Sequence, residues 1–445
     1  MVVSLMKRAF KNIGVVVSLS AIILASSCKP ELSDFEPQAG QVDFSKYIAI
    51  GNSLTAGYAD GGLYLEGQNV AYPNLLAAQL TAIGGGEFRS PLFAENEKNG
   101  SGYLRLAALV DGQPELENVT TELAIRGTNP NDKPLYTKFT GEIENYGVPG
   151  MRMDLAFAPG MGTQLGNPYF ERLLEDDAPQ TLTYQEYVSA KEHTFFSFWL
   201  GNNDILGYAM NGAVAEENDP TTTLTETVTF TTGLNAFVSA LTTGNQNGVI
   251  ATIPDVTAIP YFTTVTRQAL IAAVSAASGQ DIQDLYITAG SGQAQKASDS
   301  DLFVLPFSSS GLLGSTSAQN PVPYGLDPRN PIESKYVLDS DETKLIQARV
   351  KEFNAAIKEV AESESLALAD AYTYLNKIKS PGIKYNGIGV NAAFITGNAF
   401  SLDGIHLTPM GNALIANLFI DAINSTYKSR IPKVNAAQYR GVKFP

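Results

Sequence analysis

The fold is decided by a short apolar run that ends in a serine-bearing turn, YIAIGNSLTAGY at residues 47–58. Four consecutive apolar residues closed by Gly51 predict a buried strand. Asn52, Ser53 and Thr55 are of the types that begin helices. The sequence therefore predicts that Ser53 lies at the carboxyl end of a strand, where open α/β sheets bind their ligands. An ordinary capped turn between a strand and a helix has the same composition, so other segments must decide between the two.

Four later segments repeat the strand pattern, and helical patterns separate them. The predicted strands are 142–146, 194–200, 248–253 and 366–370, and the predicted helices are 72–80, 340–364 and one that begins after Thr408 with Pro409 in its first turn. The near-continuous apolarity of residues 194–200 is typical of a strand buried on both faces of a parallel sheet. Strands alternating with helices predict an α/β fold, a flavodoxin-like three-layer sandwich with about five parallel strands.

Three segments rich in Gly, Asn, Thr, Ser or Pro interrupt this alternation. They lie near residues 84–141, 263–333 and 380–400. We expect them to be large loop insertions that frame the mouth of a site, since connecting segments of this length commonly carry function.

The N-terminal segment has the features of a secretory signal peptide. Residues 1–27 carry three basic residues, then an apolar run from Ile13 to Ala25, and end in small residues. The next residue, Cys28, is the only cysteine, and the preceding Leu24-Ala25-Ser26-Ser27 resembles a bacterial lipobox in which Ala25 replaces the usual Leu. We expect lipidation of Cys28, with residues 28–42 as a tether to a membrane. A free thiol or an intermolecular disulfide is the alternative.

Charge and composition exclude some partners. The formal net charge is −15 and the pI is about 4.7, which argues against nucleic acid as a partner because phosphate binding needs a basic surface. No His/Cys cluster has metal-ligand spacing, so the sequence predicts no metal and no cofactor. The acid pair Asp176-Asp177 could suggest glycosidase or metal chemistry, but its polar surroundings are more typical of a solvated face.

The strongest chemical pattern joins Ser53 to the far end of the chain. A serine hydroxyl becomes a good nucleophile when a base takes its proton, and the base needs an acid to orient it. Of the two histidines, His193 precedes a buried strand, where a structural role is expected. His406 follows Asp403 by three residues in a Gly-containing turn, a spacing that lets one loop hold the carboxylate against the imidazole. An Asp turn before a capped helix is the alternative.

Four blocks resemble the SGNH (GDSL-type) hydrolase family of serine esterases and occur in that family's order. They are GNSL at 51–54, NYGVPG at 145–150, GNND at 201–204 and DGIH at 403–406. The resemblance implies that Ser53 is the nucleophile, His406 the base and Asp403 its orienting acid. It also implies an oxyanion hole built from the amides of Ser53 and Gly150 and the side chain of Asn203. The family usually has Asp where this chain has Asn52, which can accept the same capping hydrogen bonds.

The resemblance implies a serine esterase that hydrolyses carboxylic esters through an acyl-enzyme, without a cofactor. Acyl or acetyl esters on a carbohydrate, on a lipid or on another small molecule are equally compatible with this resemblance. The expected layout is a hydrolase domain over residues 43–430 and a tail over 431–445. The expected location is the cell envelope, as an outer-membrane lipoprotein facing the periplasm or the surface. A non-catalytic surface lipoprotein that binds glycans is the alternative, and the intact Ser53, Asn203, Asp403 and His406 set speaks against it.

Overall fold

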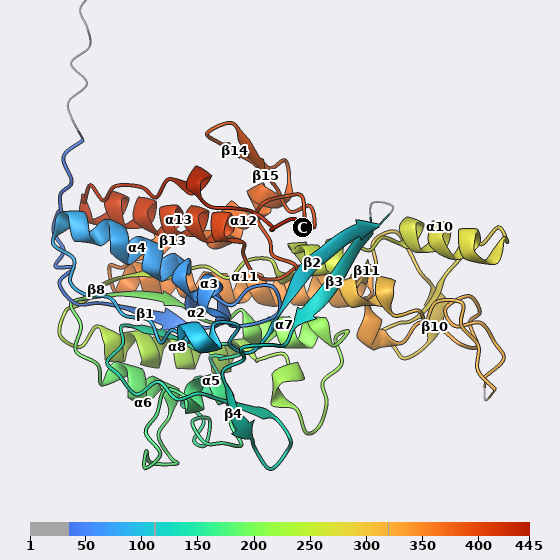
Figure 1. The fold of residues 1–445 in the computed structure, drawn as a ribbon, viewed down its shortest axis with the longest axis horizontal. Coiled ribbons are helices and arrows are strands. Elements are labelled where there is room, and N and C mark those ends of the chain that lie inside the picture. The colour runs from blue at the N-terminus through green and yellow to red at the C-terminus, as the bar shows by residue number, and fades with distance from the viewer. Residues whose placement is uncertain (1–34, 111–112, 319) are drawn as a thin grey trace, which may run out of the picture. The chain divides into compact units, whose positions relative to one another are not determined.

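The structure, a computed structural model, describes residues 35–110, 113–318 and 320–445 (Figure 1). The expected signal peptide and Cys28 lie outside these residues, so both stay predictions. Residues 37–445 form one unit of structure. Within the described residues, no helix is long and apolar enough to cross a membrane.

The core of this unit is a sheet of five parallel strands. Their order is β13-β8-β7-β1-β6, with bounds β1 Tyr47–Gly51, β6 Asn145–Gly147, β7 Phe195–Trp199, β8 Asn247–Ala251 and β13 Ala367–Ala369. Numbered along the chain this is the order 2-1-3-4-5 of flavodoxin-like folds, which confirms the predicted fold class. Every residue of β1 and β7 is buried, as their apolar sequences predicted.

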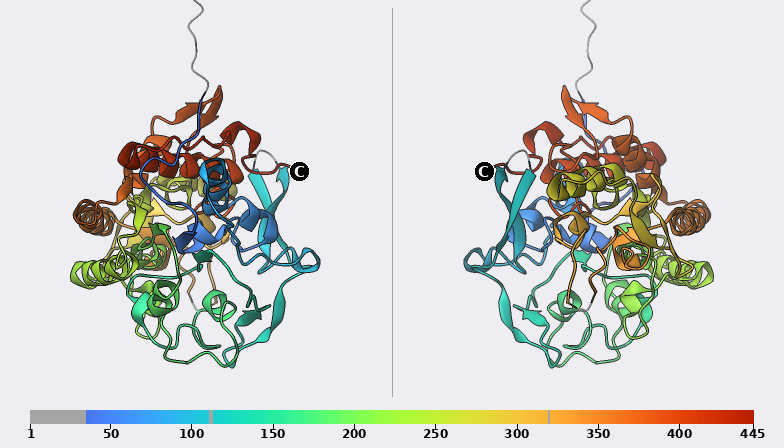
Figure 2. Two further views of the ribbon diagram at one scale, coloured as in Figure 1. Left: turned by 90° about the vertical axis from the view of Figure 1, so that its left-hand side faces the viewer. Right: turned by 90° about the vertical axis from the view of Figure 1, so that its right-hand side faces the viewer.

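Helices cover both faces of the sheet (Figures 1 and 2). One layer holds α4 Tyr72–Leu80 and α13 Pro409–Tyr427, and the other holds α6 Tyr184–Ser189, α8 Thr227–Leu241 and α11 Ser340–Ser363. A capping box between Asp339 and Glu342 begins α11, and the rings of Phe230 and Phe353 stack at 3.8 Å where α8 meets α11. The side chain of Thr408 caps α13 by accepting a hydrogen bond from Gly411 N.

The predicted insertions form small antiparallel sheets and short helices outside the central sheet. Their strands are β2 Tyr103–Val110, β3 Gln113–Val119, β4 Ile125–Thr128, β5 Pro134–Tyr136, β9 Tyr286–Thr288, β10 Ala294–Lys296, β11 Leu302–Phe303, β12 Val337–Leu338, β14 Ile383–Tyr385 and β15 Ile388–Val390. The remaining helices are α2 Ser53–Ala56, α3 Leu65–Asn69, α5 Pro168–Glu171, α7 Asn203–Met210, α9 Pro260–Thr263, α10 Arg267–Ser278 and α12 Ala371–Lys379. The β2–β3 hairpin is the longest of these additions and packs beside the central fold (Figure 1).

Both ends of the folded unit lie against α13. Gln38 forms a bridge with Arg430, and Gln41 N donates to Tyr427 O at 3.2 Å. The Tyr427 hydroxyl donates to Gly248 O at 2.7 Å, at the amino end of β8. The start of this unit therefore lies at the amino ends of the strands.

Residues 431–445 pack back along α13. Asn417 Nδ2 donates to Val434 O at 2.8 Å, and Met410 N donates to Arg440 O at 2.9 Å. Hydrogen bonds at both ends of this segment hold it to the helix, so it contributes to the surface of the folded unit.

Candidate active site

The predicted site residues gather at the carboxyl ends of the parallel strands. Ser53 follows β1, Gly150 follows β6 and Asn203 follows β7, while Asp403 and His406 lie in the loop before α13. The strand order reverses between β1 and β7, and open α/β sheets bind ligands outside such a switch point. All five residues line one cavity of about 1140 Å³.

Ser53, His406 and Asp403 form a hydrogen-bonded row. The distance from Ser53 Oγ to His406 Nε2 is 2.8 Å, and that from His406 Nδ1 to Asp403 Oδ2 is also 2.8 Å. Ser53 is 7% exposed, and the side chains of His406 and Asp403 are 12% and 10% exposed. The row is therefore largely shielded from water, with the serine hydroxyl at its cavity end.

The Asp403 carboxylate is held by several donors besides the imidazole. Oδ1 accepts hydrogen bonds from the amides of Ile405 and His406, each at 2.8 Å, and Oδ2 accepts one from Gly61 N at 2.9 Å. Burial acts to raise the pKa of Asp403, but the charge of His406 and these hydrogen bonds together hold it well below its ordinary value. An ionised Asp403 keeps the proton on Nδ1, which leaves Nε2 to accept the proton of Ser53.

A second loop, which contains Asp60, holds the Asp403 turn in place. Asp60 N donates to Ser401 Oγ at 3.0 Å, and Asp60 Oδ1 accepts from Leu402 N at 2.9 Å. The Tyr58 ring lies 4.7 Å from the His406 ring. The dipeptide Asp60-Gly61 predicts a turn, but this pattern does not predict contact with a residue some 340 positions away. Sequence reasoning therefore missed Asp60 and Ser401.

Three residues with available hydrogen-bond donors, Ser53, Gly150 and Asn203, line the cavity. Among the described residues, the amides of Ser53 and Gly150 have no hydrogen-bond acceptor. Asn203 Nδ2 donates one hydrogen to Met151 O at 2.9 Å, which leaves its second hydrogen available. Gly150 has φ of +78°, a conformation that favours glycine, while a Cβ there would meet nothing closer than 3.5 Å. Backbone conformation, more than lack of space, explains the glycine.

A buried arginine fixes the loop that carries Gly150. Arg152 is 1% exposed and donates to the carbonyl oxygens of Asn203, at 3.3 Å, and Thr223, at 2.9 Å. Its charge is balanced by Asp154 at 2.8 Å. The loop after β6 is thus tied to the start of α7. Nothing in the spacing of the sequence distinguishes Arg152 from a surface arginine, so sequence reasoning missed it.

Asp204, the last residue of the GNND block, joins the same network. Its Oδ2 accepts from Met153 N at 2.7 Å and its Oδ1 from Thr225 Oγ1 at 3.0 Å. Burial, with the nearby charge of Asp154, raises the pKa of Asp204 to about 7. Asp204 therefore holds the loop that carries Gly150 in place, and it does not line the cavity.

Asn52 occupies the position at which the chain departs from the family pattern. Its Oδ1 accepts from Leu54 N at 3.2 Å and caps α2, as expected for an amide in place of a carboxylate. Asn52 Nδ2 is buried and has no hydrogen-bond partner in the described part of the chain. The same holds for Asn202 Oδ1. Both side chains line a small hollow of about 40 Å³ next to Ser53.

Two other residues considered from the sequence, His193 and Asp176, do not line the cavity at Ser53. His193 stands at the amino end of β7, with its ring nitrogens 2.8 Å from Lys191 O and 3.0 Å from Leu241 O. Asp176 is a surface residue, 92% exposed and 3.3 Å from Lys138. Within residues 35–110, 113–318 and 320–445, no group of three or more His, Cys, Asp or Glu side chains could hold a metal ion.

The chain belongs to the GDSL-like lipase/acylhydrolase family, whose family model matches residues 47–419. Membership and the hydrogen-bonded row at Ser53 define an ester-hydrolysing enzyme. None of the curated proteins matches the sequence.

Several solved structures are similar to this chain at low sequence identity. A lipase/acylhydrolase from Enterococcus faecalis is 12% identical, with 87% of this chain and 99% of that chain covered and a TM-score of 0.32. A mutant acetyl-xylooligosaccharide esterase from Geobacillus Stearmophilus is 11% identical, with 86% and 96% covered and a TM-score of 0.35. An α/β hydrolase from the metagenome of Lake Arreo, Spain, is 13% identical, with 86% and 96% covered and a TM-score of 0.33.

Proposed function

We propose that this protein is a serine esterase that hydrolyses carboxylic esters through an acyl-enzyme intermediate. Ser53 is the nucleophile, His406 the general base and acid, and Asp403 the group that orients His406. The observation that carries this proposal is the pair of 2.8 Å contacts that link Ser53 Oγ, the imidazole and the Asp403 carboxylate beside a large cavity. Nucleophile, base and orienting acid in hydrogen-bonding reach define acyl-transfer chemistry.

In the first half of the reaction, Ser53 Oγ attacks the ester carbonyl carbon while His406 Nε2 accepts the hydroxyl proton. The carbonyl oxygen becomes negatively charged in the tetrahedral state. When that state collapses, His406 gives its proton to the leaving alcohol oxygen, the bond from carbon to that oxygen breaks, and the acyl group remains on Ser53.

In the second half, a water molecule attacks the acyl carbon and His406 takes one of its protons. Collapse of the second tetrahedral state returns the proton to Ser53 Oγ and releases the carboxylic acid. Asp403 stays ionised throughout, since its hydrogen bonds and the nearby imidazolium both favour the carboxylate.

The three cavity-facing donors have a role in the same scheme. We assign the amides of Ser53 and Gly150 and the free Nδ2 hydrogen of Asn203 to an oxyanion hole, because preorganised donors stabilise the charge that develops on the carbonyl oxygen. Arg152 and Asp204 act as positioning residues that hold the Gly150 loop against α7.

Replacing Asn203 by Ala should lower kcat by roughly 10²- to 10³-fold with a small change in KM, because this donor matters most once charge has developed. Asn211→Ala is a matched control, since Asn211 ends the same helix and donates only to Val214 O and Glu216 on the surface. We expect it to keep wild-type kinetics. An Asn203→Ala effect confined to KM would show that Asn203 binds the substrate without stabilising the oxyanion.

Purified protein separates this proposal from a non-catalytic glycan-binding function. An esterase should hydrolyse simple esters and be labelled once by a fluorophosphonate probe, with the modified peptide containing Ser53. A glycan-binding protein would leave esters intact and take up no probe, because labelling requires an activated serine. Absence of both hydrolysis and labelling would therefore contradict the esterase.

We also propose that the enzyme is an envelope lipoprotein held by acyl chains on Cys28. What supports it is the sequence pattern of residues 1–28. Cys28→Ser should move the protein from the membrane fraction to the soluble fraction with unchanged activity. Residues 38–41 pair with residues 427–430 at the end of α13 opposite the catalytic loop, which is why activity should survive. A membrane-bound, processed Cys28→Ser protein would exclude Cys28 as the anchor.

A further inference from the structure

Two hollows of very different size share Ser53 and His406 in their walls. The large one has a volume of about 1140 Å³ and the small one about 40 Å³. A volume of the second kind accommodates a single water molecule or a group of similar size. Since an ester has an acyl part and an alcohol part, this asymmetry fits a substrate in which one part is small and the other is large.

The wall of the large cavity is apolar. Much of it is made by leucine, proline and aromatic side chains, among them Leu104, Pro114, Leu116, Leu206, Phe394 and Leu402. Apart from Asp403 and His406, no described residue that lines it is ionisable in the neutral pH range. The large part of the substrate therefore meets hydrocarbon over most of its surface.

Several polar side chains in this wall already donate hydrogen bonds to the protein itself. Ser308 Oγ donates to Leu305 O at 3.0 Å, and Asn167 Nδ2 donates to Pro149 O at 2.8 Å. A sugar would bring many hydroxyl groups into a wall with few free partners, which is unfavourable. Each buried methylene of a hydrocarbon chain, by contrast, favours binding about fourfold.

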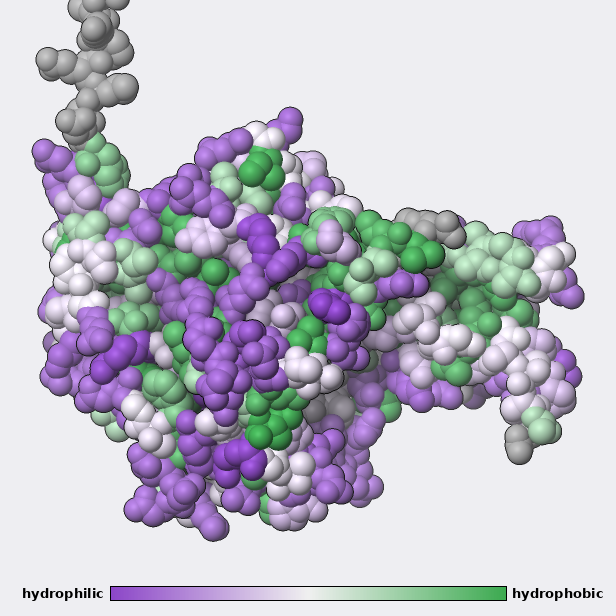
Figure 3. Space-filling view, viewed as in Figure 1, coloured by the Kyte–Doolittle hydropathy of each residue, from purple (hydrophilic) through white to green (hydrophobic). Residues whose placement is uncertain are grey.

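The β2–β3 hairpin turns an apolar face toward the cavity. Its pairs Leu106↔Leu116 and Leu109↔Pro114 flank a β-bulge that shifts the register between Leu106 and Ala108. A bulge inserts one extra residue and so re-aims the side chains that follow it. Here the bulge keeps Leu109 on the same face of the hairpin as Leu106. Figure 3 shows hydrophobic surface over this part of the hairpin.

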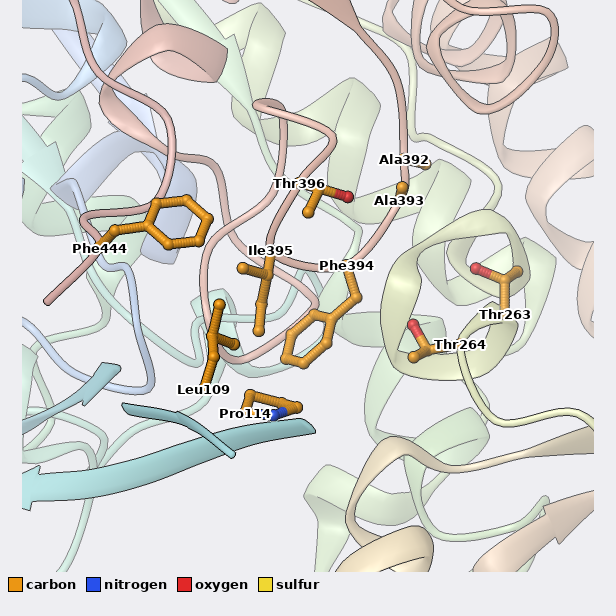
Figure 4. A pocket seen from close by; sticks show the side chains of 10 residues that line it. All are labelled: Leu109, Pro114, Thr263, Thr264, Ala392, Ala393, Phe394, Ile395, Thr396 and Phe444. Carbon is orange, nitrogen blue, oxygen red and sulfur yellow. The ribbon is translucent and has the colours of Figure 1, made fainter. Parts of the chain in front are cut away.

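Beyond the large cavity lies a second apolar hollow of about 330 Å³. Pro114 and Phe394 line both the cavity and this hollow, so the two share part of their walls. Figure 4 shows the Phe394 ring above Pro114, with Leu109 and Ile395 on one side and Thr264 on the other. No described residue that lines this second hollow is charged. It extends the hydrocarbon surface away from Ser53.

We infer that the substrate is an ester with one small group and one long hydrocarbon chain, and that the chain runs along the β2–β3 hairpin toward the hollow at Phe394. The inference rests on the proposed esterase function and narrows its substrate class. The chain can be the acyl or the alcohol part, and the test below distinguishes these. It accounts for the exposed leucines of the hairpin, since the bound chain covers them.

Isomeric esters test the inference. Methyl butyrate and propyl acetate are short isomers, while methyl decanoate and nonyl acetate are long isomers, and all four can be assayed below their solubility limits by proton release. At least one long ester should exceed its short counterpart in kcat/KM by about a hundredfold or more. Preference for methyl decanoate assigns the chain to the acyl part, and preference for nonyl acetate assigns it to the alcohol part.

The hairpin offers a matched pair of variants. Leu116 lines the cavity and is 39% exposed, whereas Val110 is 48% exposed and, next to Leu109 on a strand, points to the opposite face. Leu116→Asp should lower the ratio of long-chain to short-chain kcat/KM at least tenfold, because a carboxylate would be desolvated by the chain. Val110→Asp should leave that ratio and the short-chain rate as in the wild type.

Three results would contradict the inference. If long esters were hydrolysed no better than short ones, the proposal of a long hydrocarbon chain in the substrate would be wrong, while the esterase function would still stand. If the ratio of long-chain to short-chain kcat/KM were unchanged in Leu116→Asp, or fell equally in Val110→Asp, the hairpin would not form part of the binding path. No hydrolysis of any of the four esters and no fluorophosphonate labelling would instead show that the esterase function itself is wrong.

Discussion

Replacing Ser53 by Ala should reduce ester hydrolysis by at least about 10³-fold and abolish fluorophosphonate labelling. The substitution removes the single oxygen that both attacks the carbonyl and carries the acyl group, so the two-step route is closed. Residual turnover would come from the cavity and the oxyanion donors acting on water. On the free-energy scale the loss corresponds to about 4 kcal/mol of transition-state stabilisation.

The fold should tolerate this substitution. Ser53 Oγ has its hydrogen bond with His406, at the edge of the cavity, and the change leaves the apolar core intact. The thermal midpoint of Ser53→Ala should therefore stay within a few degrees of the wild type, which separates chemistry from folding. Normal turnover in a variant without this hydroxyl would remove Ser53 from the mechanism.

The two histidines provide the second large contrast. His406→Gln should lose roughly 10³-fold or more of kcat/KM, because an amide keeps a polar side chain between Ser53 and Asp403 but cannot accept and return a proton. His193→Gln should keep activity within about twofold. His193 contacts backbone carbonyls at the opposite end of the sheet, so its loss should instead cost stability on the order of 1 kcal/mol.

Kinetics and thermal unfolding on both variants check this contrast. We expect His406→Gln to unfold near the wild-type temperature and His193→Gln to unfold earlier. If His193→Gln were the inactive variant and His406→Gln the active one, the pairing of Asp403 with His406 would have no catalytic role.

The central fold could be predicted because its signals are local. The apolar run before Ser53, the run at 194–200 and the helical spacing of Ile346, Val350 and Phe353 each specify an element within a few residues. Alternation of these elements then indicates the parallel sheet. The insertions could be located by composition, but their hairpins depend on pairings between short segments that periodicity alone does not fix.

For the site, sequence reasoning could predict residues that belong to recognisable blocks. Ser53, Gly150, Asn203, Asp403 and His406 all lie at one cavity. It could not predict Asp60 and Ser401, whose partners are far away in sequence, or Arg152, which becomes distinctive only when buried. Residues that support a site through tertiary contacts leave no pattern in one sequence, whereas residues that end strands or cap helices do.

The start of the folded unit lies beside the C-terminal end of α13, at the opposite end of that helix from the catalytic loop. The helix has 19 residues and is therefore about 28 Å long, with the catalytic loop before its first turn and residues 37–41 beside its last. Residues 37–41 and the catalytic loop are therefore separated by roughly the length of this helix. We therefore expect substitutions within residues 37–41 to leave the contact between Ser53 and His406 unchanged.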